Sequence, residues 1–154
     1  MTDQPRKELV VSAIENGTVI DHIPSANVFQ VMKILGLDKT ENQVLFGTNL
    51  VSRKYGSKGI IKVRNQFFED REINKISLVA PNATLIVIKD FNIVEKRHVQ
   101  VPDKIESMVK CFNPKCITNH EAIPTRFKVV DKEDLRLLCH YCEKITKKEN
   151  VQFI

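Results

Sequence analysis

The chain has no tryptophan, few aromatic residues and no long apolar run, and these shortages argue against several classes of protein. Aromatic residues make up 6% of its 154 residues, which is sparse for a surface that stacks on nucleic-acid bases. No stretch approaches the roughly 18 apolar residues of a membrane span. The polar segment 1–8 also lacks the apolar core of a secretory signal. We therefore expect a globular cytoplasmic protein without a membrane partner.

A concentrated region of one charge is missing too. The net charge of +5 mildly favours anionic partners such as phosphates or nucleic acid. Residues 1–102 carry 14 basic and 11 acidic side chains, and residues 103–154 carry 10 and 8. Neither half has the dense basic patch of a nucleic-acid-binding surface, so we expect no nucleic-acid partner.

No arrangement of catalytic residues stands out. We find neither a serine or cysteine nucleophile paired with histidine nor a converging pair of carboxylates. Asp21 and His22 are adjacent in "GTVIDHIP", which is predicted to be a strand. Neighbouring strand residues point to opposite faces, so we expect this pair to form no dyad. Each could instead contact a different part of one ligand, and we predict no catalytic residue.

Strand and helix patterns alternate over the first hundred residues. Amphipathic helices are predicted at 25–36, capped by Ser25 and ended by Gly36, and at 69–81, ended by Pro81. The order β-α-β-β-α-β is that of a ferredoxin-like α/β sandwich, an antiparallel sheet with two helices on one face. The predicted strands are 10–14, 18–23, 43–50, 59–67 and at least one within 83–96.

All four cysteines lie in the last third of the chain, with the spacing C-x4-C, 22 residues, C-x2-C. Clustered thiols in a cytoplasmic chain favour metal binding over disulfides. Four thiolates form a closed tetrahedral Zn²⁺ site with no open position for water, so one structural zinc ion is predicted. His120 or His140 replacing one cysteine, and four unpaired core thiols, are the alternatives. The predicted ligands are Cys111, Cys116, Cys139 and Cys142.

The cysteine region is predicted to be a separate, small all-β domain. The polar segment 96–106 divides it from the α/β pattern, and we place the domains at 1–101 and 102–154. About 50 residues bury little apolar surface, so metal binding is expected to stabilise the second domain. Its predicted strands are 108–112, 126–130, 135–139 and 151–154.

Four motifs, in this order, resemble the regulatory chain of aspartate carbamoyltransferase. They are "GTVIDHIP" at 17–24, "VRNQF" at 63–67, "APNAT" at 80–84, and the cysteine pattern ending in "CHYCEK" at 139–144. The resemblance covers nearly the whole chain. It implies a non-catalytic subunit of pyrimidine biosynthesis, with an N-terminal allosteric domain that binds nucleoside triphosphates and a zinc domain that docks on a catalytic chain. CTP would inhibit and ATP would activate.

The resemblance also implies which residues contact the nucleotide. Asp21 would hold the ribose, Lys62 the ribose and base region, and Lys96 the phosphates. His22 would reach the phosphate end, with Lys58 a weaker candidate beside it. The full implied set is Val11, Ala13, Ile14, Val19, Asp21, His22, Lys62, Ile88, Phe91, Ile93 and Lys96.

Two positions depart from the family pattern, namely Ile86, where Asn is usual, and Phe91, where Tyr is usual. The loss of a polar group near the pocket leaves base preference and synergy between pyrimidine nucleotides open, while nucleotide binding itself is still expected.

The resemblance further implies an assembly. Regulatory chains would pair through their allosteric domains, and three pairs would join two catalytic trimers into a dodecamer of six catalytic and six regulatory chains. A zinc-ribbon nucleic-acid-binding protein is the alternative from another class, and an enzyme with its site in the N-terminal domain is a second. The candidates for the surface that docks on the catalytic chain are Asn113, Lys115, Glu143 and Lys144.

Overall fold

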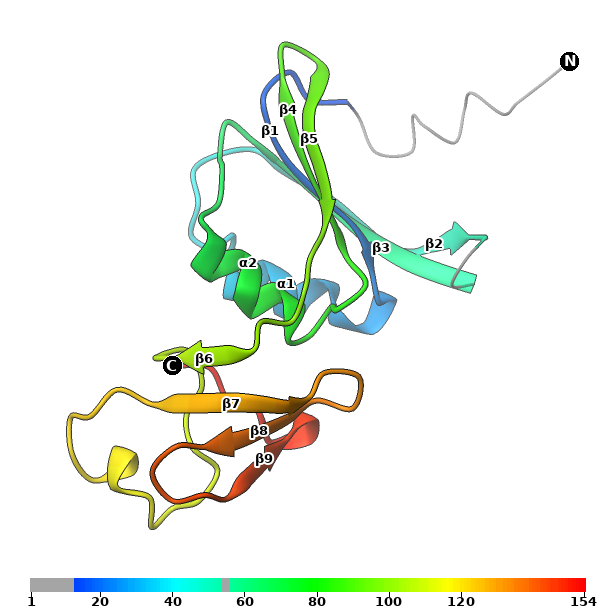
Figure 1. Cartoon of the computed structure of the whole chain (residues 1–154). Helices are drawn as coiled ribbons and strands as arrows, with labels where there is room; N and C mark the ends of the chain where they lie inside the picture. Colours follow the sequence, from blue (N-terminus) through cyan, green and yellow to red (C-terminus); the bar gives the residue numbers. More distant parts are fainter. Residues whose placement is uncertain (1–12, 54–55) are drawn as a thin grey trace, which may run out of the picture. The chain divides into compact units, whose positions relative to one another are not determined.

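The computed structural model describes residues 13–53 and 56–154. The chain divides into two compact units, Met1–Gln100 and Val101–Ile154 (Figure 1). Among the described residues, no helix has the length and apolar character needed to cross a membrane.

The first unit is a five-stranded antiparallel sheet, sheet A, with two helices against one face (Figure 1). The strand order is β2-β3-β1-β4-β5, which is the order of a ferredoxin-like sheet with β5 added beside β4. The predicted fold class is therefore confirmed. Residues 10–12 of the first predicted strand lie outside the described residues, and Ala13 and Ile14 are not in a strand. The strands are β1 Gly17–Ile23, β2 Val44–Ser52, β3 Gly56–Arg64, β4 Thr84–Lys89 and β5 Asn92–His98.

The first predicted helix begins later than expected. Helix α1 spans Val28–Ile34 and follows a short 3-10 turn, η2, at Ser25–Asn27. The predicted cap was wrong, because the Ser25 hydroxyl makes no cap hydrogen bond and donates to Ser57 Oγ at 3.0 Å. The end was right: Gly36 follows the helix with φ +68, the left-handed conformation in which glycine commonly ends helices.

The second helix, α2 at Asp70–Ser77, begins with a capping box. The side chains of Glu69 and Glu72 each bond the other residue's backbone N–H, which satisfies two donors that the first turn leaves unpaired. Ile73 and Ile76 are buried, so the predicted apolar stripe packs into the core of the unit.

The second unit is a four-stranded antiparallel sheet, sheet B, in the order β6-β7-β8-β9. The strands predicted at 108–112 and 151–154 are wrong, since they meet only through an isolated bridge between Val109 and Phe153. Val109 is fully buried, so the apolar character of its segment reflects core packing, with strand pairing limited to that one bridge. The strands are β6 Lys104–Glu106, β7 Arg126–Asp131, β8 Arg136–Cys139 and β9 Ile145–Lys147.

Candidate functional site

The second unit brings the four predicted cysteines together. Their Sγ atoms all lie within 4.8 Å of one another. Cys111 and Cys142 are 3.6 Å apart at their sulfurs, and Cys116 and Cys139 are 3.7 Å apart. A tetrahedral ion with metal–sulfur bonds of about 2.3 Å separates its ligands by about 3.8 Å. The four sulfurs therefore fit one tetrahedral metal ion without a histidine.

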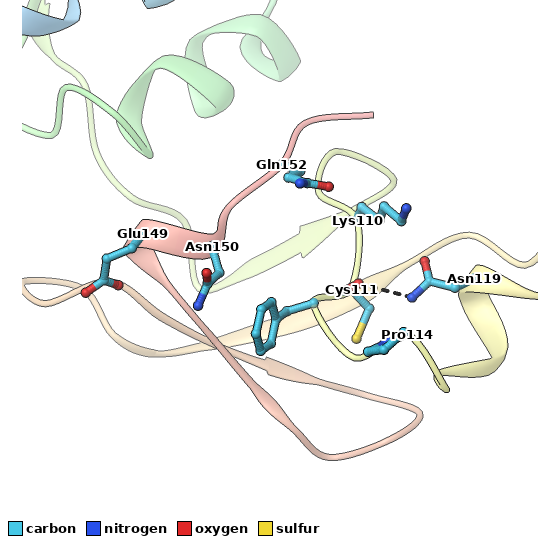
Figure 2. Close-up of a pocket in the computed structure, with 8 residues that line it drawn as sticks. Lys110, Cys111, Pro114, Asn119, Glu149, Asn150 and Gln152 are labelled. Carbon is cyan, nitrogen blue, oxygen red and sulfur yellow. Dashed lines mark hydrogen bonds between the residues drawn. The ribbon is translucent and has the colours of Figure 1, made fainter.

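Local hydrogen bonds hold the cysteine turns in this arrangement. The Asn119 side chain donates to the carbonyl oxygen of Cys111 at 3.1 Å and to that of Asn113 at 2.7 Å, and Figure 2 shows the first of these bonds. The hydroxyl of Thr118 lies 3.2 Å from the sulfur of Cys116. Sequence reasoning missed Asn119 and Thr118, because nothing in the cysteine spacing marks which neighbours support the ligands.

The environment of the sulfurs affects how readily each thiol ionises. Burial raises the pKa values of Cys111 and Cys139. Burial acts in the same direction on Cys142, but hydrogen bonds from the Asn113 side chain and the Lys144 backbone help to lower its pKa to about 7. Among these three, Cys142 thus forms a thiolate most readily, whereas the thiols of Cys111 and Cys139 need the charge of a metal ion to lose their protons.

A cavity of about 480 Å³ lies beside Cys111 (Figure 2). It is lined on one side by the Cys111 turn and on the other by the C-terminal segment, including Glu149 and Gln152. A second cavity of about 680 Å³, on sheet B, includes Glu143 in its lining. Of the four residues predicted to dock on a catalytic chain, only Glu143 lines one of these two cavities.

In the first unit, a β-bulge in β1 determines where Asp21 and His22 point. Ile20 pairs with Ile61 and Ile23 pairs with Gly59, so the two residues between them oppose one residue of β3. Ile20 and Ile23 are both fully buried. They lie on the helix side of the sheet, since Gly59, which pairs with Ile23, faces α1: a Cβ added at Gly59 would overlap Val28 of this helix.

The bulge places Asp21 and His22 together on the opposite face of the sheet. We call this face, which the helices do not cover, the open face. Asp21 pairs directly with Thr84 on β4, and the His22 ring nitrogen Nδ1 lies 3.1 Å from the Thr84 hydroxyl. The expectation that Asp21 and His22 point to opposite faces was therefore wrong. His22 adopts the left-handed conformation, with φ 59, which bends the strand at this point.

A row of four residues crosses the middle of the open face. Lys62 on β3 pairs with Val19 on β1, Val19 pairs with Ile86 on β4, and Ile86 pairs with Lys96 on β5. Directly paired residues share a face, and neighbouring strands are about 4.8 Å apart. The backbones of Lys62 and Lys96 are thus three strand spacings, or about 14 Å, apart across the sheet. Two apolar side chains form a floor between two cations.

Two oppositely charged groups of this face, Asp21 and Lys58, lie at one end of β1. The Lys58 ammonium lies 2.8 Å from the Asp21 carboxylate. Burial lowers the pKa of Lys62, and the charge of Asp21 offsets part of this effect. An anion bound here would therefore stabilise a cation that the fold has partly removed from water.

The other end of the face, which we call the apolar end, carries exposed apolar side chains together with Arg64, which pairs with Gly17. The Phe91 N–H donates to the Glu15 carbonyl at 2.9 Å, and the Asp90 N–H donates to the Asn16 side chain at 3.0 Å. These bonds hold the segment that contains Ala13 and Ile14 beside the turn between β4 and β5. Phe91 is 67% exposed and Ile93 is 60% exposed.

Most of the residues implied for nucleotide contact thus lie along one face and its apolar end. Val11 lies outside the described residues. Thr84, which pairs with Asp21, was missed, because only the register of β1 against β4 brings it there. The implied residues on the open face itself are Val19, Asp21, His22, Lys62, Ile88, Ile93 and Lys96.

Comparison with known proteins gives a consistent result for both units. Residues 9–100 match the family described as "Aspartate carbamoyltransferase regulatory chain, allosteric domain", and residues 103–152 match the corresponding "metal binding domain". The chain is 49% identical to an aspartate carbamoyltransferase regulatory chain of Parabacteroides distasonis, over 98% of both chains. It is 50% identical to that of Bacteroides fragilis over 97% of each, and 50% identical to that of Pyrococcus abyssi over 94% of this chain and 96% of the relative.

Proposed function

This chain belongs to the family of aspartate carbamoyltransferase regulatory chains, and we propose that its first unit binds CTP and ATP as opposing effectors on the open face. The observation that carries this proposal is the row of Lys62, Val19, Ile86 and Lys96 across sheet A. An apolar floor between two cations suits a ligand that combines a flat ring with phosphates. The nucleic-acid-binding alternative has no comparable support, because both units match regulatory-chain families.

In this proposal the parts of the nucleotide follow the polarity of the face. The base lies toward the apolar end, near Ile88 and Phe91. The Asp21 carboxylate accepts hydrogen bonds from the ribose hydroxyls. Lys96 and His22 contact the phosphates, and Lys62 reaches the ribose and base region.

The effect on catalysis would pass through a change of quaternary state. We propose that a separate catalytic chain docks on the second unit, around Asn113, Lys115, Glu143 and Lys144, and that regulatory chains pair within a dodecamer of six catalytic and six regulatory chains. Inhibitor and activator can oppose each other from one site only if they differ in their affinity for two states of the assembly. A coupling of about 1–3 kcal/mol would be ordinary.

The metal in this proposal is zinc, and its role is structural. Four thiolates at tetrahedral spacing are the donor set that zinc prefers in closed sites, with no position left for water. The cytoplasm is the proposed location, because a reducing compartment keeps such thiols available for a metal.

The proposal is tested by reconstitution with the catalytic chain of the same organism. We expect the zinc-loaded chain to co-elute with catalytic trimers on a sizing column, and CTP and ATP to move the aspartate saturation curve in opposite directions. Calorimetry on the regulatory chain alone should show binding of both nucleotides. Separate elution with zinc present, or no heat from either nucleotide, would overturn the proposal.

A further inference from the structure

A buried hydroxyl lies between two imidazoles at the charged end of the open face. Thr84 is 1% exposed. Its Oγ1 lies 3.1 Å from His22 Nδ1 and 3.4 Å from His98 Nδ1. Thr84 pairs with Asp21 on one side and with His98 on the other, so all these residues share one face. His98 belongs to none of the roles described so far.

The hydroxyl couples the protonation states of the two rings. Thr84 has one proton to donate and two lone pairs with which to accept. If both rings are neutral, the hydroxyl donates to Nδ1 of one ring and accepts from Nδ1 of the other. If one ring becomes imidazolium, its Nδ1 donates to Thr84, and Thr84 donates in turn to Nδ1 of the other, neutral ring. If both rings become imidazolium, Thr84 accepts from both, and its own proton then needs another acceptor.

The charges around this pair favour an anionic ligand. The charged groups on the described strands of the open face are Asp21 on β1, Lys58, Lys62 and Arg64 on β3, and Lys96 on β5. Asp21 is the one anion among them, and Lys58 pairs with it. A polyphosphate bound among these cations would bring negative charge close to both imidazoles, which favours their charged form.

We propose that His98, coupled to His22 through Thr84, is an anion-binding residue of the nucleotide site, and that polyphosphate binding takes up a proton from solvent at this imidazole pair. The inference rests on the proposed nucleotide site and adds a residue and a proton to it. His98 is an exposed residue, so its Nε2–H can donate to a phosphate oxygen. Histidine is the side chain that ordinarily changes charge between pH 5 and 8, so affinity should increase as pH falls.

The test measures affinity and proton uptake by calorimetry, with ATP and with CTP, on the full zinc-loaded chain. Titrations run from pH 6.5 to 8.5 in buffers that differ in ionisation enthalpy, so that protons taken up are counted directly. If binding takes up one proton, the dissociation constant rises by up to about tenfold for each unit by which pH increases. The terminal phosphate of the nucleotide titrates as well, so the informative quantity is the difference between variants.

Two variants at position 98 separate charge from structure. His98→Arg supplies a permanent cation, so it should bind like the wild type at pH 6.5 but lose part of the pH dependence and of the proton uptake. His98→Gln should bind about tenfold more weakly at pH 6.5, because a charge-assisted hydrogen bond is lost. Arg97→Gln is the matched control, because Arg97 pairs with Asp70 and Glu95 and not with this cluster. It should keep the wild-type profile.

The outcomes distinguish this inference from the function on which it rests. If the wild type binds both nucleotides and both variants at position 98 keep its pH dependence and proton uptake, the role of His98 is wrong and the nucleotide site stands. If the wild type binds neither nucleotide, the proposed function is wrong and the inference fails with it. Binding by His98→Arg at pH 6.5 also shows that the variant is folded.

Discussion

Replacing Lys62 with methionine should affect stability and ligand binding in opposite directions. Methionine keeps most of the length of the lysine side chain and removes its charge. In the chain without ligand, burial lowers the pKa of Lys62, and the charge of Asp21 offsets only part of this decrease. The folded state therefore holds the ammonium less favourably than water does. Lys62→Met should therefore stabilise the free first unit, provided that its packing beside Val19 is kept.

The size and pH dependence of this effect follow from the position of the side chain. Lys62 is half-buried, so most of its hydration remains and the gain should be below about 1 kcal/mol, or a few degrees in unfolding midpoint. A lowered lysine pKa means that the cost is fully present below the folded-state pKa. The cost disappears as pH rises from there toward 10.5, the ordinary lysine value. The advantage of the variant should thus be largest near neutral pH.

Ligand binding should show the reverse. Loss of a charge-assisted hydrogen bond of about 1.5–3 kcal/mol weakens nucleotide binding by about 10- to 100-fold. Thermal unfolding with and without ATP, together with calorimetry, measures both effects in one variant. Lys75→Met, on α2, is a control that should leave binding unchanged. A Lys62→Met chain that binds ATP as the wild type does, or that unfolds earlier without ligand, would refute the reasoning.

Three further predictions concern the metal, the base and the backbone. Removal of the metal by a chelator should abolish the native amide signals of sheet B in NMR spectra while those of sheet A persist, and retention of the sheet B signals would contradict the structural role of the metal. Metal affinity should also fall as pH falls, because burial raises the pKa values of Cys111 and Cys139. Ile86→Asn should change the ratio of CTP to ATP affinity by about threefold or more, the effect of one added hydrogen bond, and an unchanged ratio in calorimetry would remove Ile86 from the site. Gly17→Ala should destabilise the first unit by about 2 kcal/mol or more, because its Cβ would overlap the Val63 carbonyl. Gly36→Ala, also at positive φ but with open space around it, should cost only about 1 kcal/mol, and equal losses in denaturant unfolding would contradict the overlap.

Features set by local chemistry could be predicted from the sequence. The spacing of four cysteines indicated a cluster, because a metal site needs few residues at short intervals. Gly36 ended a helix where the apolar pattern stopped, and the acidic first turn of α2 marked its start. The strands predicted at 108–112 and 151–154 failed for the opposite reason: apolar side chains mark burial, and burial does not require pairing in a sheet.

Features set by strand register could not be predicted. The bulge in β1 exists because Ile20 and Ile23 both enter the core, which leaves Asp21 and His22 against a single residue of β3. The sequence displays two adjacent polar residues but not the residue they oppose. The contact between Thr84 and His98 likewise depends on the pairing of β4 with β5, over residues with no common motif.

These register-dependent features share a physical property, in that they are unfavourable in the free chain. His22 is held at φ 59, a conformation costly for most residues other than glycine. Lys62 is partly desolvated, and on the described strands three lysines, one arginine and two histidines share a face with one carboxylate. A bound polyphosphate would offset the charge repulsion and the desolvation together, so nucleotide binding should stabilise the first unit more than its contact area alone suggests. If the effect is electrostatic, added salt should reduce it steeply.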